Sequence, residues 1–369
     1  MTIRAVIVGC AHMHVNEVAL YIHEEPSHLL AGVADLPADL PENTEKRYTR
    51  AWNRANIAEK YGAPVYEDYL EMLDTVKPDV AYVLCENSKK AEVAEEIAKR
   101  GIDVILEKPM AVDSENARRI VALKEKYGVN VFVNWPVAWR NYVHEMKAAL
   151  DSGMCGTLQK MRYINGHTGP LGKGAKHRGV SENAEEMTDE ERSRIWWYRS
   201  ESGGGAFLDI LCYGCYYARW LFGMMPKEVM AIADNLNTSY GDVEDNLAAL
   251  LRFDGGFAVA EGTWTTPRKR IPTGPELICS EGVIWCDGVS DGKSFVSAVG
   301  IGGEELATPT LTEREDFRNM PCQYAAFRNE GKAMFETLSA EFNADVVAMI
   351  EAARRSAESR RAEIPEGAC

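Results

Sequence analysis

Alternation between apolar runs and a helical pattern at the start of the chain constrains the fold more than any other feature. Residues 3–8 form a short apolar run that stops at Gly9, which is typical of a buried parallel strand. A helical pattern follows over residues 15–24, and a second apolar run over residues 29–34 ends at Asp35. A strand, a helix and a second strand with an acid at its tip form the unit that binds a dinucleotide.

The same alternation continues to about residue 133. Further strand and helix patterns lie at residues 82–84, 90–99, 104–106, 114–127 and 129–133. Alternation of this kind builds a parallel sheet with right-handed crossovers. We therefore predict an α/β chain whose residues 1–140 form a doubly wound Rossmann domain that binds NAD.

The pattern changes after Arg140. A helix is expected over residues 142–150, and closely spaced alternating strands are expected at residues 160–167, 228–233, 246–253, 257–265, 275–279 and 282–286. Such spacing favours an open, mostly antiparallel sheet. We predict a C-terminal α+β domain over residues 141–369 for substrate binding and oligomerisation. Residues 169–195 are predicted to form a long loop over the site, and a helix over residues 345–360 can pack back on the first domain.

The loop after the first strand departs from the usual dinucleotide code. In place of GxGxxG the sequence reads Gly9-Cys10-Ala11-His12-Met13-His14. Ala11 still allows a pyrophosphate to approach the helix N-terminus, whereas His14 predicts looser packing of helix on strand. Asp35 can accept ribose hydroxyls and would repel a 2′-phosphate, which favours NAD over NADP. Two alternatives stay open: Asp35 is a solvated acid, or an arginine among Arg47, Arg50 and Arg54 pairs with a phosphate.

Two clusters downstream carry groups suited to chemistry. Glu107-Lys108-Pro109 directly follows an apolar run, and that end of a parallel strand faces the ligand crevice. A glycine run at 203–205 precedes a helix on which Asp209 and Tyr213 are four residues apart and share a face. A tyrosine acidified by a lysine suits proton transfer to or from a sugar hydroxyl or ketone. The alternatives are an ordinary charge pair at a strand end and an aromatic core helix.

Together these motifs resemble the glucose-fructose oxidoreductase and inositol dehydrogenase family, known as Gfo/Idh/MocA. The supporting phrases are the degenerate loop, Glu107-Lys108-Pro109, the GGGAFLD segment followed by Tyr213, and the segments 151–158 and 351–356. The resemblance covers nearly the whole chain. It implies NAD-dependent or NADP-dependent hydride transfer on a secondary alcohol of a sugar, cyclitol or glycoside, and a homo-oligomer, either a dimer or a tetramer, formed through the open sheet.

The resemblance also implies residue roles. Lys108 would contact the nicotinamide end and the reacting oxygen, Asp209 would bind substrate, and Tyr213 would act as acid or base with its pKa lowered by Lys108. The predicted cofactor contacts are Gly9, Cys10, Ala11, His12, Met13, Asp35, Cys85, Glu86, Asn87, Glu107, Lys108, Asn134 and Trp135. The predicted substrate contacts are Lys108, Trp139, Lys176, His177, Tyr198, Asp209 and Tyr213. No metal is expected. Glu86 stands where the family commonly has proline, and Lys90 where it often has histidine.

Three other functions stay open. His12-Met13-His14 has the HxH form used by zinc hydrolases. A bound NAD could also oxidise a sugar carbon transiently, acidify the neighbouring carbon and allow a glycoside to be eliminated without net redox change. A sensor that binds NAD without catalysis is the third.

Composition excludes several classes of protein. The 369 residues suffice for two domains, and a net charge of −15 argues against nucleic acid as a partner. No apolar stretch approaches the roughly 20 residues that span a bilayer, and the N-terminus has no signal-peptide layout. Nine cysteines, an odd number, argue against a disulfide framework. These features predict a cytoplasmic enzyme.

Overall fold

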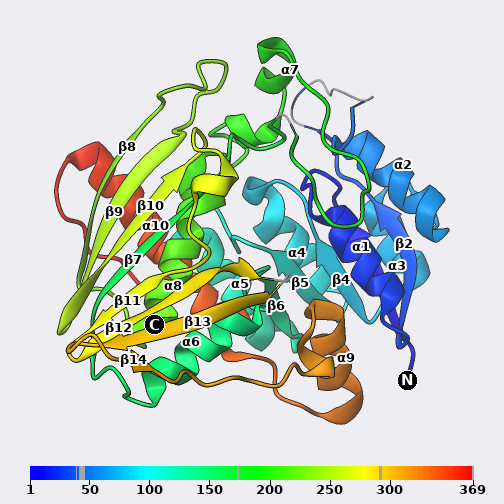
Figure 1. The fold of residues 1–369 in the computed structure, drawn as a ribbon. Helices are drawn as coiled ribbons and strands as arrows, with labels where there is room; N and C mark the ends of the chain where they lie inside the picture. The colour runs from blue at the N-terminus through cyan, green and yellow to red at the C-terminus, as the bar shows by residue number, and fades with distance from the viewer. Residues whose placement is uncertain (39, 41–45, 173, 291–292, 368–369) are drawn as a thin grey trace.

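The computed structural model describes residues 1–38, 40, 46–172, 174–290 and 293–367 (Figure 1). Its first domain contains a six-stranded parallel sheet in the order β3-β2-β1-β4-β5-β6. The strands are β1 (Ile3–Val8), β2 (His28–Ala34), β3 (Val65–Tyr66), β4 (Val80–Val83), β5 (Asp103–Glu107) and β6 (Val131–Asn134). The strand order reverses between β1 and β4, which is where doubly wound sheets bind ligands. The predicted Rossmann fold is confirmed.

Helices cover both faces of this sheet (Figure 1). They are α1 (Val15–Glu24), α2 (Arg50–Tyr61), α3 (Tyr69–Val76), α4 (Lys90–Ala98) and α5 (Ser114–Tyr127), with a short η1 (Asn87–Lys89) before α4. The strands are apolar on both sides because both faces are covered, and β4 and β5 are buried throughout. The sequence patterns predict no elements in the segment that forms α2, β3 and α3.

The second domain contains an eight-stranded sheet in the order β14-β13-β12-β11-β7-β10-β9-β8. Its strands are β7 (Leu158–Gly166), β8 (Glu228–Asp234), β9 (Asn246–Phe253), β10 (Gly256–Thr263), β11 (Glu276–Cys279), β12 (Gly282–Ser290), β13 (Lys293–Gly300) and β14 (Glu305–Leu306). All neighbours are antiparallel except β7 and β10, which run parallel. This confirms the mostly antiparallel sheet, although β13 and β14 were not predicted.

The helical elements of the second half lie along one face of that sheet and at its junction with the first domain (Figure 1). They are α6 (Asn141–Asp151), α7 (Asp189–Ser193), η2 (Trp196–Tyr198), η3 (Phe207–Leu211), α8 (Cys212–Phe222), η4 (Arg268–Arg270), η5 (Glu315–Phe317), α9 (Met320–Glu330), η6 (Glu336–Leu338) and α10 (Ala340–Ser359). Within the described part of the chain, no helix has the length and apolar character needed to cross a membrane.

Two segments tie the domains together. α10 contacts α5 and β6 of the first domain as well as α8 and β8 of the second. The irregular segment after β7 crosses to the first domain, where Tyr48 donates a hydrogen bond to the Glu182 carbonyl at 3.0 Å and Lys60 to the Gly179 carbonyl at 2.7 Å. Both segments belong to the second half of the chain and contact the first domain. The division of the chain at residue 140 stays a prediction.

Gly9 holds the turn after β1 against β4, and its replacement should be costly. Its φ is +90°, and a Cβ there would lie 2.5 Å from the Cys85 backbone nitrogen. We expect Gly9→Ala to lower the free energy of unfolding by about 2 kcal/mol or more. Gly62→Ala is the matched control, since Gly62 also has positive φ but a Cβ there would meet no atom within 4 Å; it should cost about 1 kcal/mol. Equal losses in urea unfolding would contradict the role of this close contact.

Candidate active site

Lys108 lies at the carboxyl end of β5 and reaches across to the second domain. Its Nζ donates to the Asp209 backbone carbonyl at 2.8 Å and to Asp209 Oδ1 at 3.1 Å. Asp209 lies in η3, a π-helical turn that continues into α8. Tyr213 lies in α8, one turn after Asp209. Lys108 is 2% exposed. The structure therefore brings together the three predicted catalytic residues, although they come from two domains.

The Tyr213 ring packs against this ion pair. Lys108 Nζ lies over the ring at 4.7 Å from its centroid, the geometry of a cation–π contact. No hydrogen bond joins the Tyr213 hydroxyl to another group in the described part of the chain. The hydroxyl is thus free to meet a substrate.

Burial and charge set the protonation states of this cluster. Burial opposes the charge of Lys108, but Tyr213 and Asp209 outweigh it and raise the pKa of Lys108 well above its usual value. Burial would raise the pKa of Asp209, but Lys108 and His167 lower it further, so this carboxyl stays ionised. For Tyr213, burial raises the pKa more than Lys108 lowers it. The expected acidification of Tyr213 is therefore wrong as a net effect, because desolvation of the phenolate dominates.

His167 also contacts the Asp209 carboxylate, and the sequence patterns assign this histidine no role. Its Nε2 lies 3.3 Å from Asp209 Oδ2, and Trp264 Nε1 donates to the same oxygen at 3.0 Å. The two residues directly follow β7 and β10, which run parallel and end at the same edge of the sheet. A histidine at the end of a predicted strand was the available signal.

A second polar layer lies beside Lys108 on the Rossmann side. Glu107 Oε1 is 3.1 Å from His14 Nδ1, and its Oε2 accepts from Asn134 Nδ2 at 3.1 Å. His12 packs on His14 with ring centroids 4.5 Å apart. The possible ligand atoms of His12, His14 and Glu107 lie within 4.8 Å of one another, close enough to hold a metal ion. However, hydrogen bonds already engage His14 and Glu107, and His12 Nδ1 accepts from the His14 amide at 3.1 Å.

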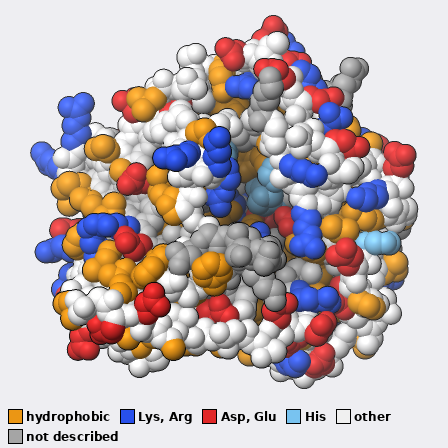
Figure 2. Space-filling view, in the orientation of Figure 1, with side chains coloured by type: hydrophobic (Ala, Val, Ile, Leu, Met, Phe, Trp, Pro, Cys, Tyr) orange, Lys and Arg blue, Asp and Glu red, His pale blue; other side chains and the backbone are white. Residues whose placement is uncertain are grey.

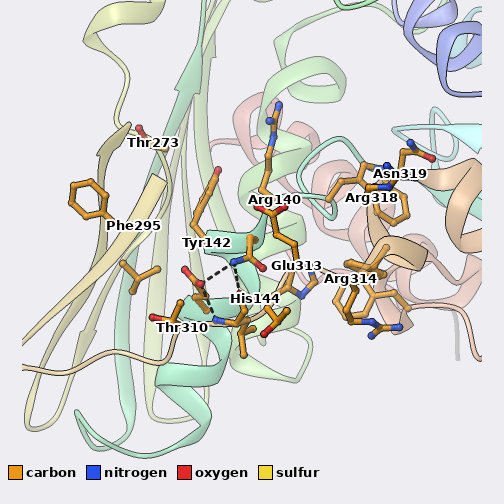
Figure 3. A pocket seen from close by; sticks show the side chains of 18 of the residues that line it. Arg140, Tyr142, His144, Thr273, Phe295, Thr310, Glu313, Arg314, Arg318 and Asn319 are labelled. Carbon is orange, nitrogen blue, oxygen red and sulfur yellow. Dashed lines mark hydrogen bonds between the residues drawn. The ribbon is translucent and has the colours of Figure 1, made fainter. Parts of the chain in front are cut away.

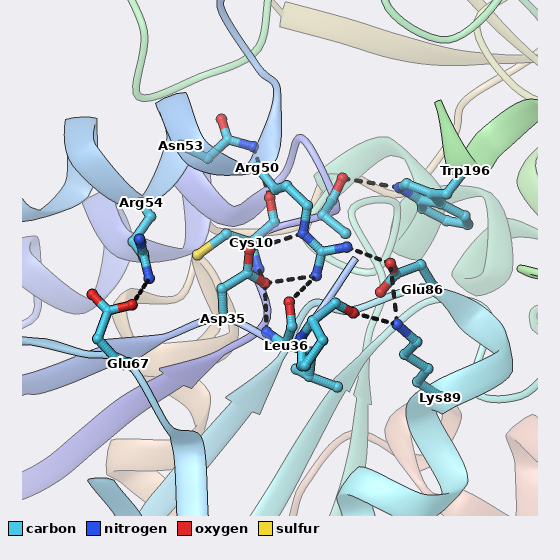
Figure 4. Close-up of polar contacts among 12 residues, drawn as sticks. Cys10, Asp35, Leu36, Arg50, Asn53, Arg54, Glu67, Glu86, Lys89 and Trp196 are labelled. Carbon is cyan, nitrogen blue, oxygen red and sulfur yellow. Dashed lines mark hydrogen bonds and ion pairs between the residues drawn. The ribbon is translucent and has the colours of Figure 1, made fainter. Parts of the chain in front are cut away.

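Asp35, which directly follows β2, forms an ion pair with Arg50 (Figure 4). Arg50 Nε donates to Asp35 Oδ2 at 2.8 Å and Arg50 NH2 to Oδ1 at 2.9 Å, while Arg50 NH1 pairs with Glu86. Burial opposes the charge, but Asp35 and Glu86 raise the pKa of Arg50. Arg47 and Arg54 pair elsewhere, with Glu185 and Glu67. Lys89 Nζ lies 3.6 Å from Glu86 as well, so two carboxylates meet two cations here and the cluster carries no net charge.

Unsatisfied polar atoms show how this edge of the sheet fits a dinucleotide. Among the buried side-chain atoms without a hydrogen-bond partner in the described residues, four lie in this region: His12 Nε2, Glu86 Oε2, Asn87 Oδ1 and Ser202 Oγ. Buried polar atoms normally have partners, so donors and acceptors without one point to a polar ligand. The hydroxyl and amide groups of NAD are of the right kind, and these residues fit it.

The adenosine end is narrow in this conformation. Trp196 Nε1 donates to the Ala11 carbonyl at 3.0 Å, which lays the segment before the glycine run on the first βα turn. The cavity left between Ala11, Arg50, Glu86 and Trp196 measures about 50 Å³, little more than the ~30 Å³ that one water molecule occupies. We expect a dinucleotide that binds at this turn to displace Trp196.

The remaining predicted contacts divide into near and distant groups. His177 packs on His14 with centroids 5.5 Å apart, and Trp139 Nε1 donates to Asn134 at 3.2 Å, so both border the cluster. Trp135 and Tyr198 are buried, with hydrogen bonds to Asn343 and the Pro170 carbonyl. Cys10, Met13 and Cys85 are buried near the first turn, Asn87 Nδ2 donates to the Gly203 carbonyl, and Lys176 is exposed.

The His14 and Glu107 pair predicts a pH dependence. Burial lowers the pKa of His14, but the Glu107 carboxylate outweighs burial and raises it. Protonation of His14 thus adds stability below the unfolded value of about 6.5, and this is lost as pH rises through the folded value. We expect Glu107→Gln to bring the pKa of His14 below 6.5 in an NMR titration and to remove the extra stability at low pH. An unchanged titration would contradict the pairing.

Comparisons with known proteins agree with this architecture. Residues 3–135 match the oxidoreductase family with an NAD-binding Rossmann fold, and residues 143–285 match the GFO/IDH/MocA C-terminal domain. Aldose-aldose oxidoreductase from Caulobacter crescentus has a similar fold, with a TM-score of 0.73 and 20% identity over 99% of this chain and 100% of that one. An oxidoreductase from Agrobacterium radiobacter, solved with NAD+, L-tartaric acid and magnesium, gives 0.72 and 15%, over 99% and 98%.

Curated relatives are distant. The rhizopine catabolism protein MocA of Rhizobium meliloti is 23% identical over 58% of this chain and 64% of its own length. Mouse trans-1,2-dihydrobenzene-1,2-diol dehydrogenase is 23% identical over 56% of each chain, and myo-inositol dehydrogenase Hyg17 of Streptomyces leeuwenhoekii is 22% identical over 81% and 79%. The chain thus spans between half and two thirds of the length of the first of these relatives. With both domains matched, the chain belongs to the Gfo/Idh/MocA oxidoreductase family.

Proposed function

We propose that this protein is an NAD-dependent oxidoreductase that acts on a secondary alcohol or ketone of a polyhydroxylated ring. The observation that carries the proposal is the buried Lys108–Asp209 ion pair with the free Tyr213 hydroxyl beside it. When bound, NAD supplies the hydride acceptor or donor. The protein's own residues bind the reacting oxygen, hold its proton and exclude water.

Lys108 is the electrophilic group of this proposal. An ammonium has three N–H donors, and Asp209 accepts from two of them through its backbone carbonyl and Oδ1. The third is left for the oxygen of the reacting carbon. Because its pKa is raised, Lys108 stays charged and stabilises negative charge that develops on that oxygen.

Tyr213 is the proton donor or acceptor. Its raised pKa keeps the phenol protonated at neutral pH, so it can donate to a ketone oxygen during reduction. During oxidation the proton moves the other way, and the nearby Lys108 ammonium stabilises the phenolate. His167, 3.3 Å from Asp209 and with a side chain that is 36% exposed, connects the ion pair to solvent.

A second candidate, transient oxidation without net redox change, is favoured by one relative. The 2,7-anhydro-N-acetylneuraminate hydratase of Mediterraneibacter gnavus is 25% identical over 57% of this chain, and a hydratase reaction produces no net oxidation. Steady formation of NADH on a panel of sugars and cyclitols supports the dehydrogenase. Turnover of an aryl glycoside with no added NAD and no NADH supports the alternative.

Replacing the proposed catalytic groups should affect the chemical step. We expect Tyr213→Phe to lower kcat by about 10²-fold to 10⁴-fold, and Lys108→Met to lower it at least as much. Tyr216→Phe is the matched control on the same helix, because its hydroxyl bonds Thr337 instead, at 2.8 Å; its kcat should stay within about threefold of wild type. Steady-state kinetics on one substrate measures all three. A Tyr213→Phe enzyme as active as the control would contradict the role.

The open sheet is proposed to join protomers. Four large apolar side chains on its outer face are 40–74% exposed: Met230, Ile232, Leu250 and Phe257. Met230 and Leu250 are cross-strand neighbours, so they form one patch. We expect Leu250→Glu to reduce the mass measured by light scattering to that of a monomer, whereas Ile301→Glu, in a turn at the far edge of the sheet, should not. A wild-type monomer would contradict this interface.

A further inference from the structure

A wide cavity opens around Arg140 and Tyr142, at the start of α6 (Figure 3). It measures about 1780 Å³ and lies between the start of α6, η4 and the segment before α9. Arg140 and Tyr142 extend in the same direction from the start of α6. Trp139, which bonds Asn134 next to Glu107, also lines the cavity. Trp139 thus contacts both the cavity and a neighbour of Glu107.

Three cations at the end of this cavity formed by η4 and the start of α6 have no ion-pair partner in the described part of the chain. They are Arg140, Arg268 and Lys269, all exposed. Arg270 follows directly, which makes residues 268–270 a run of three basic residues in a chain of net charge −15. Figure 2 shows basic side chains gathered near the centre of this face, next to a histidine. Like charges repel one another, so a bound anion would stabilise this cluster of cations.

The β-sheet places this cluster on the catalytic side. Arg268 NH1 donates to Asn165 Oδ1 at 2.9 Å. Asn165 lies two residues before His167, and residues two apart along an extended strand share a face. His167 contacts Asp209. Arg268 is therefore bonded to a residue that lies two positions, or about 7 Å of extended chain, before the histidine that contacts the catalytic carboxylate.

Four acids also line the cavity, fewer than its six basic residues, and within the described part of the chain none of them forms an ion pair with these three cations; the acids are Glu24, Glu25, Glu145 and Glu313. Glu145 accepts hydrogen bonds from the Asn141 side chain at 2.8 Å and the Leu311 amide at 3.0 Å. Two further arginines of the cavity, Arg314 and Arg318, pair with Asp316 and Glu315 instead. The positive charge at the η4 end is left for a ligand.

We propose that the substrate carries an oxyanion, a carboxylate or a phosphate, which Arg268 and Arg140 bind while the reacting carbon lies at Lys108 and Tyr213. This inference rests on the proposed function and narrows its substrate class to acidic polyols. Guanidinium groups suit it, because they bind planar oxyanions through paired N–H donors.

Calorimetric titration of the whole protein with D-glucose, D-glucuronate and glucose 6-phosphate tests the proposal. We expect one of the two anions to bind at least about tenfold more tightly than glucose. Arg268→Met should remove this preference, and Arg140→Met should weaken it. Arg162→Met is the matched control, since Arg162 lies on the opposite face of β7 and pairs with Glu276 at 3.1 Å; the preference should survive there. Binding of glucuronate and not of the phosphate would identify a carboxylate, and the reverse a phosphate.

Two results would overturn the proposal: neither anion binding better than glucose, or a preference that survives in both Arg268→Met and Arg140→Met. Thermal unfolding of each variant shows whether it is folded, and Arg140→Met provides a second test on another element. Because these titrations measure binding without hydride transfer, they can succeed when no NADH forms on any substrate. Failure of the proposed function is thereby distinguished from failure of this inference.

Discussion

The buried contact between Lys108 and Asp209 is the interaction on which the rest of the site depends. It joins the carboxyl end of β5 in one domain to the π-helical turn before α8 in the other. A buried charge is costly unless it is paired, and loss of either partner leaves the other uncompensated. The pair therefore holds the Rossmann edge against the helical face of the open sheet, and the Tyr213 ring packs against its ammonium.

Each side of this contact has its own supporting layer. On the Rossmann side, Glu107 connects His14 and Asn134, so the altered dinucleotide loop is held by hydrogen bonds where other chains use glycine. On the sheet side, His167 and Trp264 both contact Asp209 from strands that end together. The outcome is a site with a nucleotide half and a substrate half that share one ion pair.

The sequence predicts local elements and their order well, because periodicity and strand-end motifs are short-range signals. It also places Lys108, Asp209 and Tyr213 correctly as neighbours. It does not predict the Arg50 bridge between Asp35 and Glu86 or the bond from Trp196 to Ala11, because these join residues 15 to 185 positions apart. The sequence also predicts the wrong direction for the pKa shift of Tyr213. It shows that Lys108 lies beside the tyrosine, but it does not show how deeply the phenol is buried.

The most direct test of a nicotinamide-dependent site is titration of nucleotide-free protein with NAD, followed by tryptophan fluorescence. Trp196 Nε1 bonds the Ala11 carbonyl on the first βα turn, so we expect binding to change the surroundings of this indole. We expect saturable binding of one NAD per chain with a change in fluorescence that is reduced in Trp196→Phe, and weaker binding of NADP. Absence of NAD binding, with no nucleotide released from the purified protein on denaturation, would contradict the claim that the two domains form a nicotinamide-dependent active site.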